Sequence, residues 1–462
     1  MANMSLKKVK IPEQEPLIRN SNFLEVSLGY TDEMALEEAT RCLQCKHKPC
    51  VTGCPVGVEI PLFIEQILNG NIEEAYQIIK ENNALPAVCG RVCPQESQCE
   101  SKCVRAIKGE AVGIGRLERY VADWNMKNIE KSPQIIQSKN KMVAIVGAGP
   151  AGLSCAGQLS NLGYQVTIFE AFHTPGGVLV YGIPEFRLPK SIVEAEIEQL
   201  KQNGVKIETN MVIGKVVSID ELQEMGFEAI FIGTGAGIPN FMNIEGESLI
   251  GVYSANEYLT RINLMKAYLD EYDTPVRQSK SVAVIGGGNV AMDAARCAKR
   301  LGAEHVYIIY RRSESEMPAR LEEIHHAKEE GITLQLLTNP VKIIGNNQGE
   351  VTSIECVEME LGEPDATGRR RPVEKTQSNF AIDVDTVIIA IGTSPNPLIS
   401  KTTKGIDINK HGCLIVNEDM KTSRDSIYAG GDAVTGAATV ILAMGAGRAA
   451  AKAIDQYITD KQ

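Results

Sequence analysis

The chain of 462 residues is 44% hydrophobic and 23% charged, a composition typical of a folded protein with two or three domains. Its formal net charge of −11 argues against nonspecific binding to nucleic acid. No apolar run reaches the length of a membrane span, and the N-terminal residues lack the apolar core of a secretory signal. We therefore expect a cytoplasmic protein that does not insert into membranes.

Residues 1–135 are predicted to form a helical domain. The first helix has Thr31 as its candidate N-cap. Residues 60–70 repeat apolar side chains at helical spacing and stop at a glycine, and the helix that follows is predicted to end at Pro86. The polar residues 125–140 are predicted to be a linker to the next domain.

Eight of the twelve cysteines fall inside this helical domain, in the runs RCLQCKHKPCVTGCPVG (41–57) and CGRVCPQESQCESKC (89–103). A disulfide framework is not expected in the cytoplasm. Zinc accepts pairs of cysteines separated by two residues, and so do iron–sulfur clusters. Cys54 and Cys93 each precede a proline, as in cluster-binding runs. The residues alone leave zinc and iron–sulfur clusters as the alternatives.

A first dinucleotide-binding unit is predicted at 141–171, where a short β-branched strand leads into VGAGPAG and a helical pattern. Gly147 suits the tight turn, Gly149 allows a pyrophosphate close to the backbone, and Gly152 allows close packing of helix on strand. Glu170, at the end of the second strand, suits a ribose hydroxyl pair.

A second unit of the same kind begins at SVAVIGGGNVAMD and has arginines where the first has its acid. Guanidinium groups pair with a 2′-phosphate, which an acid would repel, so NADPH is favoured over NADH. The alternative is that the two arginines are solvated surface charges. The candidate residues of this site are Gly286, Gly288, Asn289, Ala291, Arg311 and Arg312.

The C-terminal run SIYAGGDAVTG resembles the second FAD motif of the two-dinucleotide-binding flavoproteins and places Gly431 and Asp432 after a short strand. A helix cap is the alternative role for Asp432. In PGGVLVYGIPEFRLPK, Gly177 is predicted to lie close to the flavin, and Arg187 is a candidate partner of phosphate or carboxylate.

The resemblance to these flavoproteins implies a discontinuous FAD-binding domain at 141–250 and 380–462 with an NADPH-binding domain at 251–379 inserted. The fold class is therefore α/β, with two Rossmann-like domains after an all-helical domain. Cys155 and Cys297 stand alone, so no dithiol is available to take electrons from FAD. Because zinc has no redox chemistry, we expect the N-terminal cysteines to hold two [4Fe–4S] clusters as the electron exit.

These motifs, together with GIGRLERYVADW and YRRSESEMPA, resemble the small-subunit family of NADPH-dependent glutamate synthase over nearly the whole chain. The same scaffold recurs in the large subunit of the electron-bifurcating NADH-dependent ferredoxin:NADP oxidoreductase and in the N-terminal half of dihydropyrimidine dehydrogenase.

The resemblance implies that one cluster takes four cysteines and the other takes three cysteines and a glutamate, which leaves Cys89 as a neighbour. Counting cysteines alone would make Cys89 the eighth ligand, and a surface salt bridge is the alternative role for Glu118. The implied ligands are Cys42, Cys45, Cys50 and Cys103 for one cluster and Cys54, Cys93, Cys99 and Glu118 for the other.

The expected reaction is hydride transfer from NADPH to FAD followed by single-electron transfer through the clusters, with no side chain as acid–base catalyst. The chain has no room for a synthase barrel, so we expect it to feed a partner synthase or oxidoreductase subunit in a hetero- or homo-oligomer. The leading hypothesis is the electron-input subunit of glutamate synthase. The alternative is the FAD and iron–sulfur subunit of the bifurcating transhydrogenase.

Overall fold

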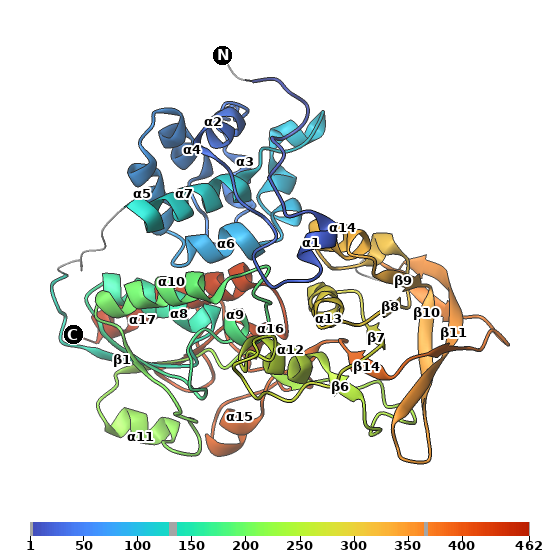
Figure 1. Ribbon diagram of the computed structural model, residues 1–462. Helices are drawn as coiled ribbons and strands as arrows, with labels where there is room; N and C mark the ends of the chain where they lie inside the picture. Colours follow the sequence, from blue (N-terminus) through green and yellow to red (C-terminus); the bar gives the residue numbers. More distant parts are fainter. Residues whose placement is uncertain (1–2, 129–135, 365–367, 462) are drawn as a thin grey trace.

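The computed structural model describes residues 3–128, 136–364 and 368–461. These residues form an N-terminal group of helices and two units built on five-stranded parallel sheets (Figure 1). The helices lie across both sheet units, with α6 against α10 and α17 and with α1 beside α14. The predicted fold class is thus confirmed. None of the helices in the described ranges is long and apolar enough to cross a membrane.

The N-terminal unit is built from short helices, and its cysteines lie in these helices and in the turns between them. Thr31 caps α2 as predicted, because its side chain accepts a hydrogen bond from the Met34 amide at 3.3 Å. The helices are α1 (Pro16–Arg19), α2 (Asp32–Ala39), α3 (Pro49–Thr52), α4 (Ile60–Leu68), α5 (Ile72–Lys80), α6 (Pro86–Val92) and α7 (Ile114–Asn128). Short 3-10 turns follow at η1 (Gln95–Ser97), η2 (Glu100–Lys102) and η3 (Val104–Ile107).

Two predicted boundaries in this unit differ from the structure. The helix predicted to run to Pro86 ends at Lys80, and Pro86 instead begins α6, where a proline loses no helical hydrogen bond. The predicted linker at 125–140 begins inside α7, which continues to Asn128. Residues 136–140 have no regular structure, and the part of this linker at 129–135 lies outside the described residues.

The first sheet unit has the strand order β16-β4-β1-β2-β3, with every neighbouring pair parallel. The run MVAIV forms its central strand because both faces of the sheet are covered by helices. The strands are β1 (Met142–Val146), β2 (Gln165–Phe169), β3 (Lys206–Glu208), β4 (Ala229–Ile232) and β16 (Ile427–Ala429). The helices are α8 (Pro150–Asn161), α9 (Val178–Tyr181), α10 (Lys190–Gln202), α11 (Ile219–Glu224), α15 (Leu398–Thr402), α16 (Asp432–Thr435) and α17 (Val440–Asp460).

The second sheet unit repeats this topology in the order β6-β14-β7-β8-β9, and an antiparallel layer covers one side of it. Its parallel strands are β6 (Val252–Ser254), β7 (Ser281–Ile285), β8 (His305–Tyr310), β9 (Thr333–Leu336) and β14 (Thr386–Ile389). Its helices are α12 (Ala255–Asn263), α13 (Asn289–Arg300), α14 (Leu321–Glu329) and the 3-10 turn η4 (Glu314–Glu316). The antiparallel strands are β10 (Thr338–Gly345), β11 (Val351–Pro364), β12 (Arg370–Glu374) and β13 (Phe380–Asp383).

The chain returns to the first unit later than residue 380, where the sequence placed the boundary. β13 pairs with β11, and β14 pairs with both β6 and β7, so 380–389 belong to the sheets of the second unit. The two segments that connect the sheet units pair with each other in a two-stranded sheet of β5 (Ile238–Pro239) and β15 (Thr393–Ser394). A buried strand such as TVII carries no local signal of which sheet it joins, and this explains the displaced boundary.

Helix α17 joins the first sheet unit to the N-terminal helices. A Cβ at Gly447 would lie 2.1 Å from the Ala151 carbonyl oxygen, so α17 packs directly on the backbone of α8. On its other side Arg448 donates a hydrogen bond to the Val56 carbonyl. Glycine at 447 is therefore required for the close approach of α17 to α8, and Arg448 joins α17 to the N-terminal unit.

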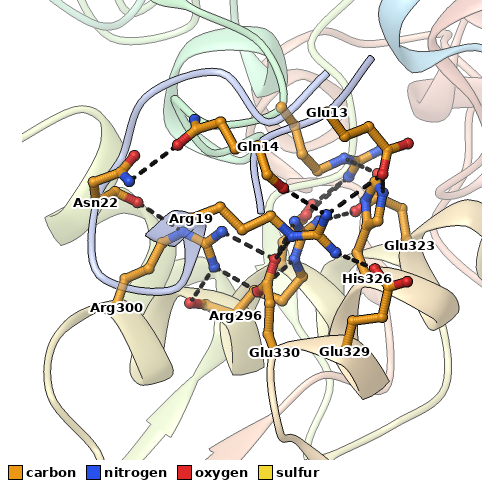
Figure 2. A network of polar contacts seen from close by, with 12 residues as sticks. Glu13, Gln14, Arg19, Asn22, Arg296, Arg300, Glu323, His326, Glu329 and Glu330 are labelled. Carbon is orange, nitrogen blue, oxygen red and sulfur yellow. Dashed lines mark hydrogen bonds and ion pairs between the residues drawn. The ribbon is translucent and has the colours of Figure 1, made fainter. Parts of the chain in front are cut away.

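A buried ionic network joins the N-terminal segment to the second sheet unit (Figure 2). Arg19, at the end of α1, donates to Glu330 at 3.0 Å, and Arg296 and Arg300 of α13 donate to the same carboxylate. His326 of α14 lies 3.2 Å from a Glu13 oxygen. The N-terminal unit thus contacts both sheet units.

Candidate functional site

The four cysteines of the first predicted set surround one cavity in the N-terminal unit. Cys42, Cys45, Cys50 and Cys103 all line it, together with apolar side chains of α4 and of the segment before α7. Burial, and then the charges of Cys42 and Cys103, raise the pKa of Cys50 to about 11. Cysteine sulfur is the ligand that iron–sulfur clusters take. The residues present fit such a cluster.

The second predicted set also converges. Burial and then the Glu118 charge raise the pKa of the Cys54 thiol, and both act in the same direction on Cys99. For Cys93 a hydrogen bond with Cys89 is the largest cause of the raised pKa, followed by burial, and the Glu118 charge adds to it. The three thiols thus each sense the charge of Glu118, and the ligand set that the family resemblance implies stays a prediction.

Asn83 contacts both Glu118 and Cys89, and the sequence analysis did not identify it. Its side-chain amide donates to Glu118 at 2.7 Å, and its side-chain oxygen accepts from the Leu85 amide and from the Cys89 thiol at 3.5 Å. Burial raises the pKa of Glu118 to about 7. Cys89 thus lies beside the second set and is in contact with Asn83. No signal in the sequence distinguishes Asn83 from other polar residues.

The first glycine-rich loop has the geometry that a dinucleotide site requires. Gly147 has a φ of +103°, and a Cβ there would lie 2.6 Å from the Gly233 carbonyl oxygen. A Cβ at Gly152 would lie 2.0 Å from the Gly147 oxygen, so α8 packs tightly on the loop. No atom lies within 4 Å of the Cβ position of Gly149, which leaves its backbone open to a ligand. α8 begins at Pro150 and points its N-terminus at this opening.

Glu170 follows β2 and closes the loop on its other side. Its carboxylate accepts hydrogen bonds from the Ala148 amide at 2.7 Å and from the Phe172 amide at 2.8 Å. Burial raises its pKa above the usual value despite these bonds. A carboxylate oxygen has two lone pairs, so each oxygen can also accept a ribose hydroxyl.

The C-terminal motif and the Gly176–Gly177 segment meet the same loop. A Cβ at Gly177 would lie 2.9 Å from Gly149, and a Cβ at Gly431 would lie 3.0 Å from Ala151. Burial raises the pKa of Asp432 to about 6. Burial also raises the pKa of Tyr181, to about 12, and the charges of Asp432 and Glu170 add to this effect. Residues from four separate parts of the chain thus surround one opening.

Arg187 has a different partner from the one predicted. Its guanidinium donates to Asp293 of α13 at 2.7 Å and lies 3.1 Å from a Glu323 oxygen. Its side chain is 6% exposed. Its guanidinium thus forms a buried ion pair with the second sheet unit, and the predicted contact with FAD stays a prediction. The sequence indicated the correct chemistry, a carboxylate partner, but could not indicate that the carboxylates belong to the chain itself.

The second glycine-rich loop repeats the geometry of the first. Gly286 has a φ of +141°, and a Cβ there would lie 2.3 Å from the Ala390 oxygen. The nearest atom to the Cβ position of Gly288 is 3.9 Å away, and Ala291 is fully buried where α13 meets the sheet. Asn289 does not point its oxygen at open space, because that oxygen accepts from the Arg320 amide at 2.9 Å.

The two arginines of the second motif follow β8, as predicted. Arg311 is exposed, and Arg312 donates from Nε to the Arg370 carbonyl at 2.8 Å. Two further arginines lie here that the sequence analysis missed, Arg369 and Arg370 of the β11–β12 hairpin. The run of three arginines at 369–371 is the signal that could have found them.

Comparison with known proteins agrees with this division of the chain. Residues 19–130 match the family described as dihydropyrimidine dehydrogenase domain II, 4Fe-4S cluster. Residues 106–453 match the pyridine nucleotide-disulphide oxidoreductases. FprA of Mycobacterium tuberculosis in complex with NADPH superposes with a TM-score of 0.59 at 19% identity, over 69% of this chain and 85% of that chain. This last likeness concerns the fold.

Relatives of known name cover almost all of the chain. The glutamate synthase [NADPH] small chain of Escherichia coli is 34% identical over 98% of this chain and 98% of its own length. The NADP(+)-dependent formate dehydrogenase subunit beta of Moorella thermoacetica is 40% identical over 89% of this chain, which spans 60% of that subunit. The chain therefore belongs to the family of glutamate synthase NADPH small chains, which are NADP-dependent flavin oxidoreductases.

Proposed function

We propose that the chain is the NADPH-oxidising, electron-input subunit of a glutamate synthase, with FAD and two [4Fe–4S] clusters as its cofactors. Near-complete coverage of the glutamate synthase small chain supports the choice of enzyme. When bound, FAD accepts a hydride from NADPH and releases electrons singly, and the clusters carry single electrons. The chain's own residues hold and orient these groups.

The observation that carries the proposal is the graded placement of the two donor sets. Cys93 and Cys99 are 5% and 8% exposed. Next to them, the Cys89 sulfur lies 3.5 Å from that of Met444 on α17, the helix that packs on the first glycine-rich loop's helix. All four cysteines of the first set, and Cys54 of the second, are more exposed. These contacts support a path in which the second set receives electrons from the first sheet unit and the first set passes them outward.

The nucleotide roles follow from the two loops. In the first unit the open backbone at Gly149 would receive the FAD pyrophosphate, Glu170 a ribose, and Asp432 the ribityl–phosphate region. In the second unit Gly288 would receive the NADPH pyrophosphate and Arg311 the 2′-phosphate. No side chain is required as a proton donor or acceptor in hydride transfer.

Iron analysis tests the number of clusters. Protein purified without oxygen should contain about eight irons per chain, since each [4Fe–4S] cluster holds four. The Cys99→Ser variant should retain FAD and lose about half of the iron. The matched variant Cys89→Ser, which changes a neighbour of the same set, should keep all of it. About four irons in the wild-type chain, or equal losses in both variants, would refute the two-cluster assignment.

Anaerobic purification from the native host tests the electron acceptor. Co-purification of a large glutaminase–synthase subunit is the expected result. A small flavoprotein with its own iron–sulfur cluster would establish the bifurcating transhydrogenase instead. A formate-oxidising subunit would be the outcome that the Moorella relative's name suggests, and it would equally refute the glutamate synthase assignment.

A further inference from the structure

The β11–β12 hairpin brings a second group of arginines to the end of β8. β12 begins at Arg370, and the hairpin is part of the antiparallel layer at the edge of the second unit (Figure 1). Arg312 donates to the Arg370 carbonyl at 2.8 Å, although 58 residues separate them in the chain. In a dinucleotide fold of this type, the residues after the second strand contact the substituent on the ribose 2′ carbon. The hairpin arginines therefore lie beside the expected 2′ position.

Glu316 orients Arg370 at this position. The Nε of Arg370 donates to Glu316 at 2.8 Å, and the other Glu316 oxygen accepts from the Ser313 amide at 3.2 Å. With both oxygens engaged, the carboxylate is satisfied within the loop. Only the Nε of Arg370 is used by this ion pair, so its two terminal nitrogens can donate as a fork, the geometry that matches phosphate.

Arg369, next to Arg370 in the chain, contacts Tyr310, the last residue of β8. It donates to the Tyr310 hydroxyl at 2.8 Å and to the Glu316 carbonyl at 2.9 Å. The Tyr310 ring lies 2.7 Å from the Cβ position of Gly287, within the second glycine-rich loop. Arg369 thus fixes an aromatic ring against the loop that would hold the pyrophosphate.

We propose that the 2′-phosphate of NADPH is bound from two sides, by Arg311 after β8 and by Arg370 from the hairpin, with Arg369 as a positioning residue for the nucleotide loop. This inference rests on the proposed use of NADPH. A phosphate dianion bound between two guanidinium groups gains charge-assisted hydrogen bonds from each. Losing one such group should weaken binding about 10- to 100-fold.

Equilibrium binding of two fragments of the cofactor tests the proposal without turnover. The FAD-loaded enzyme is titrated calorimetrically with 2′,5′-ADP, which carries the 2′-phosphate, and with 5′-AMP, which lacks it. Arg370→Met should weaken 2′,5′-ADP about 10- to 100-fold and leave 5′-AMP unchanged. Arg370→Lys should recover part of the loss, because lysine restores the charge without the fork.

Two further variants separate the roles. Arg369→Met should weaken both fragments by a similar factor, since it acts on the loop and not on the 2′ group. Arg371→Met is the matched control, because this exposed neighbour in β12 is assigned no ligand, and it should bind both fragments as the wild type does. Equal FAD content and equal thermal midpoints show that each variant is folded.

The outcomes distinguish this inference from the proposed function. If wild-type protein binds the two fragments equally, its use of NADPH is itself refuted. If wild-type protein prefers 2′,5′-ADP and Arg311→Met removes that preference, while Arg370→Met behaves like Arg371→Met, the hairpin inference alone is overturned.

Discussion

Removing the charge of Glu330 should release the second sheet unit from the N-terminal segment. This carboxylate is 1% exposed and accepts five hydrogen bonds from three arginines, Arg19, Arg296 and Arg300 (Figure 2). In the Glu330→Gln variant the shape is kept, but three buried guanidinium groups lose their common counter-charge. Breaking a buried ion pair in this way costs about 3–5 kcal/mol.

The pKa of Glu330 gives an independent magnitude. Burial alone would raise it, but the charges and hydrogen bonds of Arg296 and Arg300 outweigh burial and lower it from 4.5 to about 2. At 1.36 kcal/mol per pKa unit, this corresponds to about 3 kcal/mol of stability. Because the folded pKa lies below the unfolded one, this stability is present above pH 4.5 and is lost as the pH falls toward 2.

Hydrogen exchange measures the effect locally, which suits a chain with several units. At pH 7 the amides of residues 14–22 and of α14 should exchange about 100-fold faster in Glu330→Gln, the equivalent of about 3 kcal/mol. Glu329→Gln is the matched control: its half-exposed side chain pairs with Arg19 alone, and its loss should cost less than about 1 kcal/mol. Equal exchange in both variants would refute the reasoning.

Three further predictions concern the nucleotide loops and the isolated thiols. Gly152→Ala should lose FAD absorbance, because its Cβ would lie 2.0 Å from a carbonyl oxygen, whereas Gly149→Ala should fold with wild-type circular dichroism and only bind FAD more weakly. Asp432→Asn should raise the thermal midpoint of FAD-free protein at pH 7 while weakening FAD binding. Burial raises the Asp432 pKa from 3.8 to about 6. The ionised carboxylate therefore destabilises the folded protein increasingly between pH 3.8 and pH 6 and fully above pH 6. Burial also raises the thiol pKa of Cys155 and of Cys297 far above the usual range, so iodoacetamide at pH 8 should leave both unlabelled by mass spectrometry. A higher midpoint with unchanged FAD affinity in Asp432→Asn, or an alkylated Cys155, would contradict these arguments.

The parts that the sequence predicted well are those determined by neighbouring residues. A strand, a glycine turn and a helix follow one another within about 30 residues, the pattern of a dinucleotide-binding unit. Gly147 and Gly286 both adopt positive φ in the tight turn that follows the strand. Thr31 caps α2 through a hydrogen bond with Met34, only three residues along the chain. The pattern of neighbouring residues was sufficient to predict these elements and the division of the chain into three parts.

The parts that it missed depend on contacts between units. Arg187 pairs with Asp293, 106 residues away, and nothing in GIPEFRLPK indicates that carboxylate. Arg370 reaches the end of β8 only because the antiparallel layer folds back over it. β14 was assigned to the wrong side of a boundary because strand pairing, not composition, decides which sheet a buried run joins.

These same long-range contacts hold the three units of the chain in fixed positions relative to one another. In the proposed function, hydride transfer requires two nucleotides in direct contact and transfer to the clusters requires short, fixed distances, so relative motion of the units has to be limited. α17 ties the N-terminal helices to the first sheet unit, Arg187 ties the first sheet unit to the second, and Arg19 ties the second back to the N-terminal segment. Each of the three units is therefore joined to the other two. The buried ion pairs lie at the junctions between units because their role is to position the units.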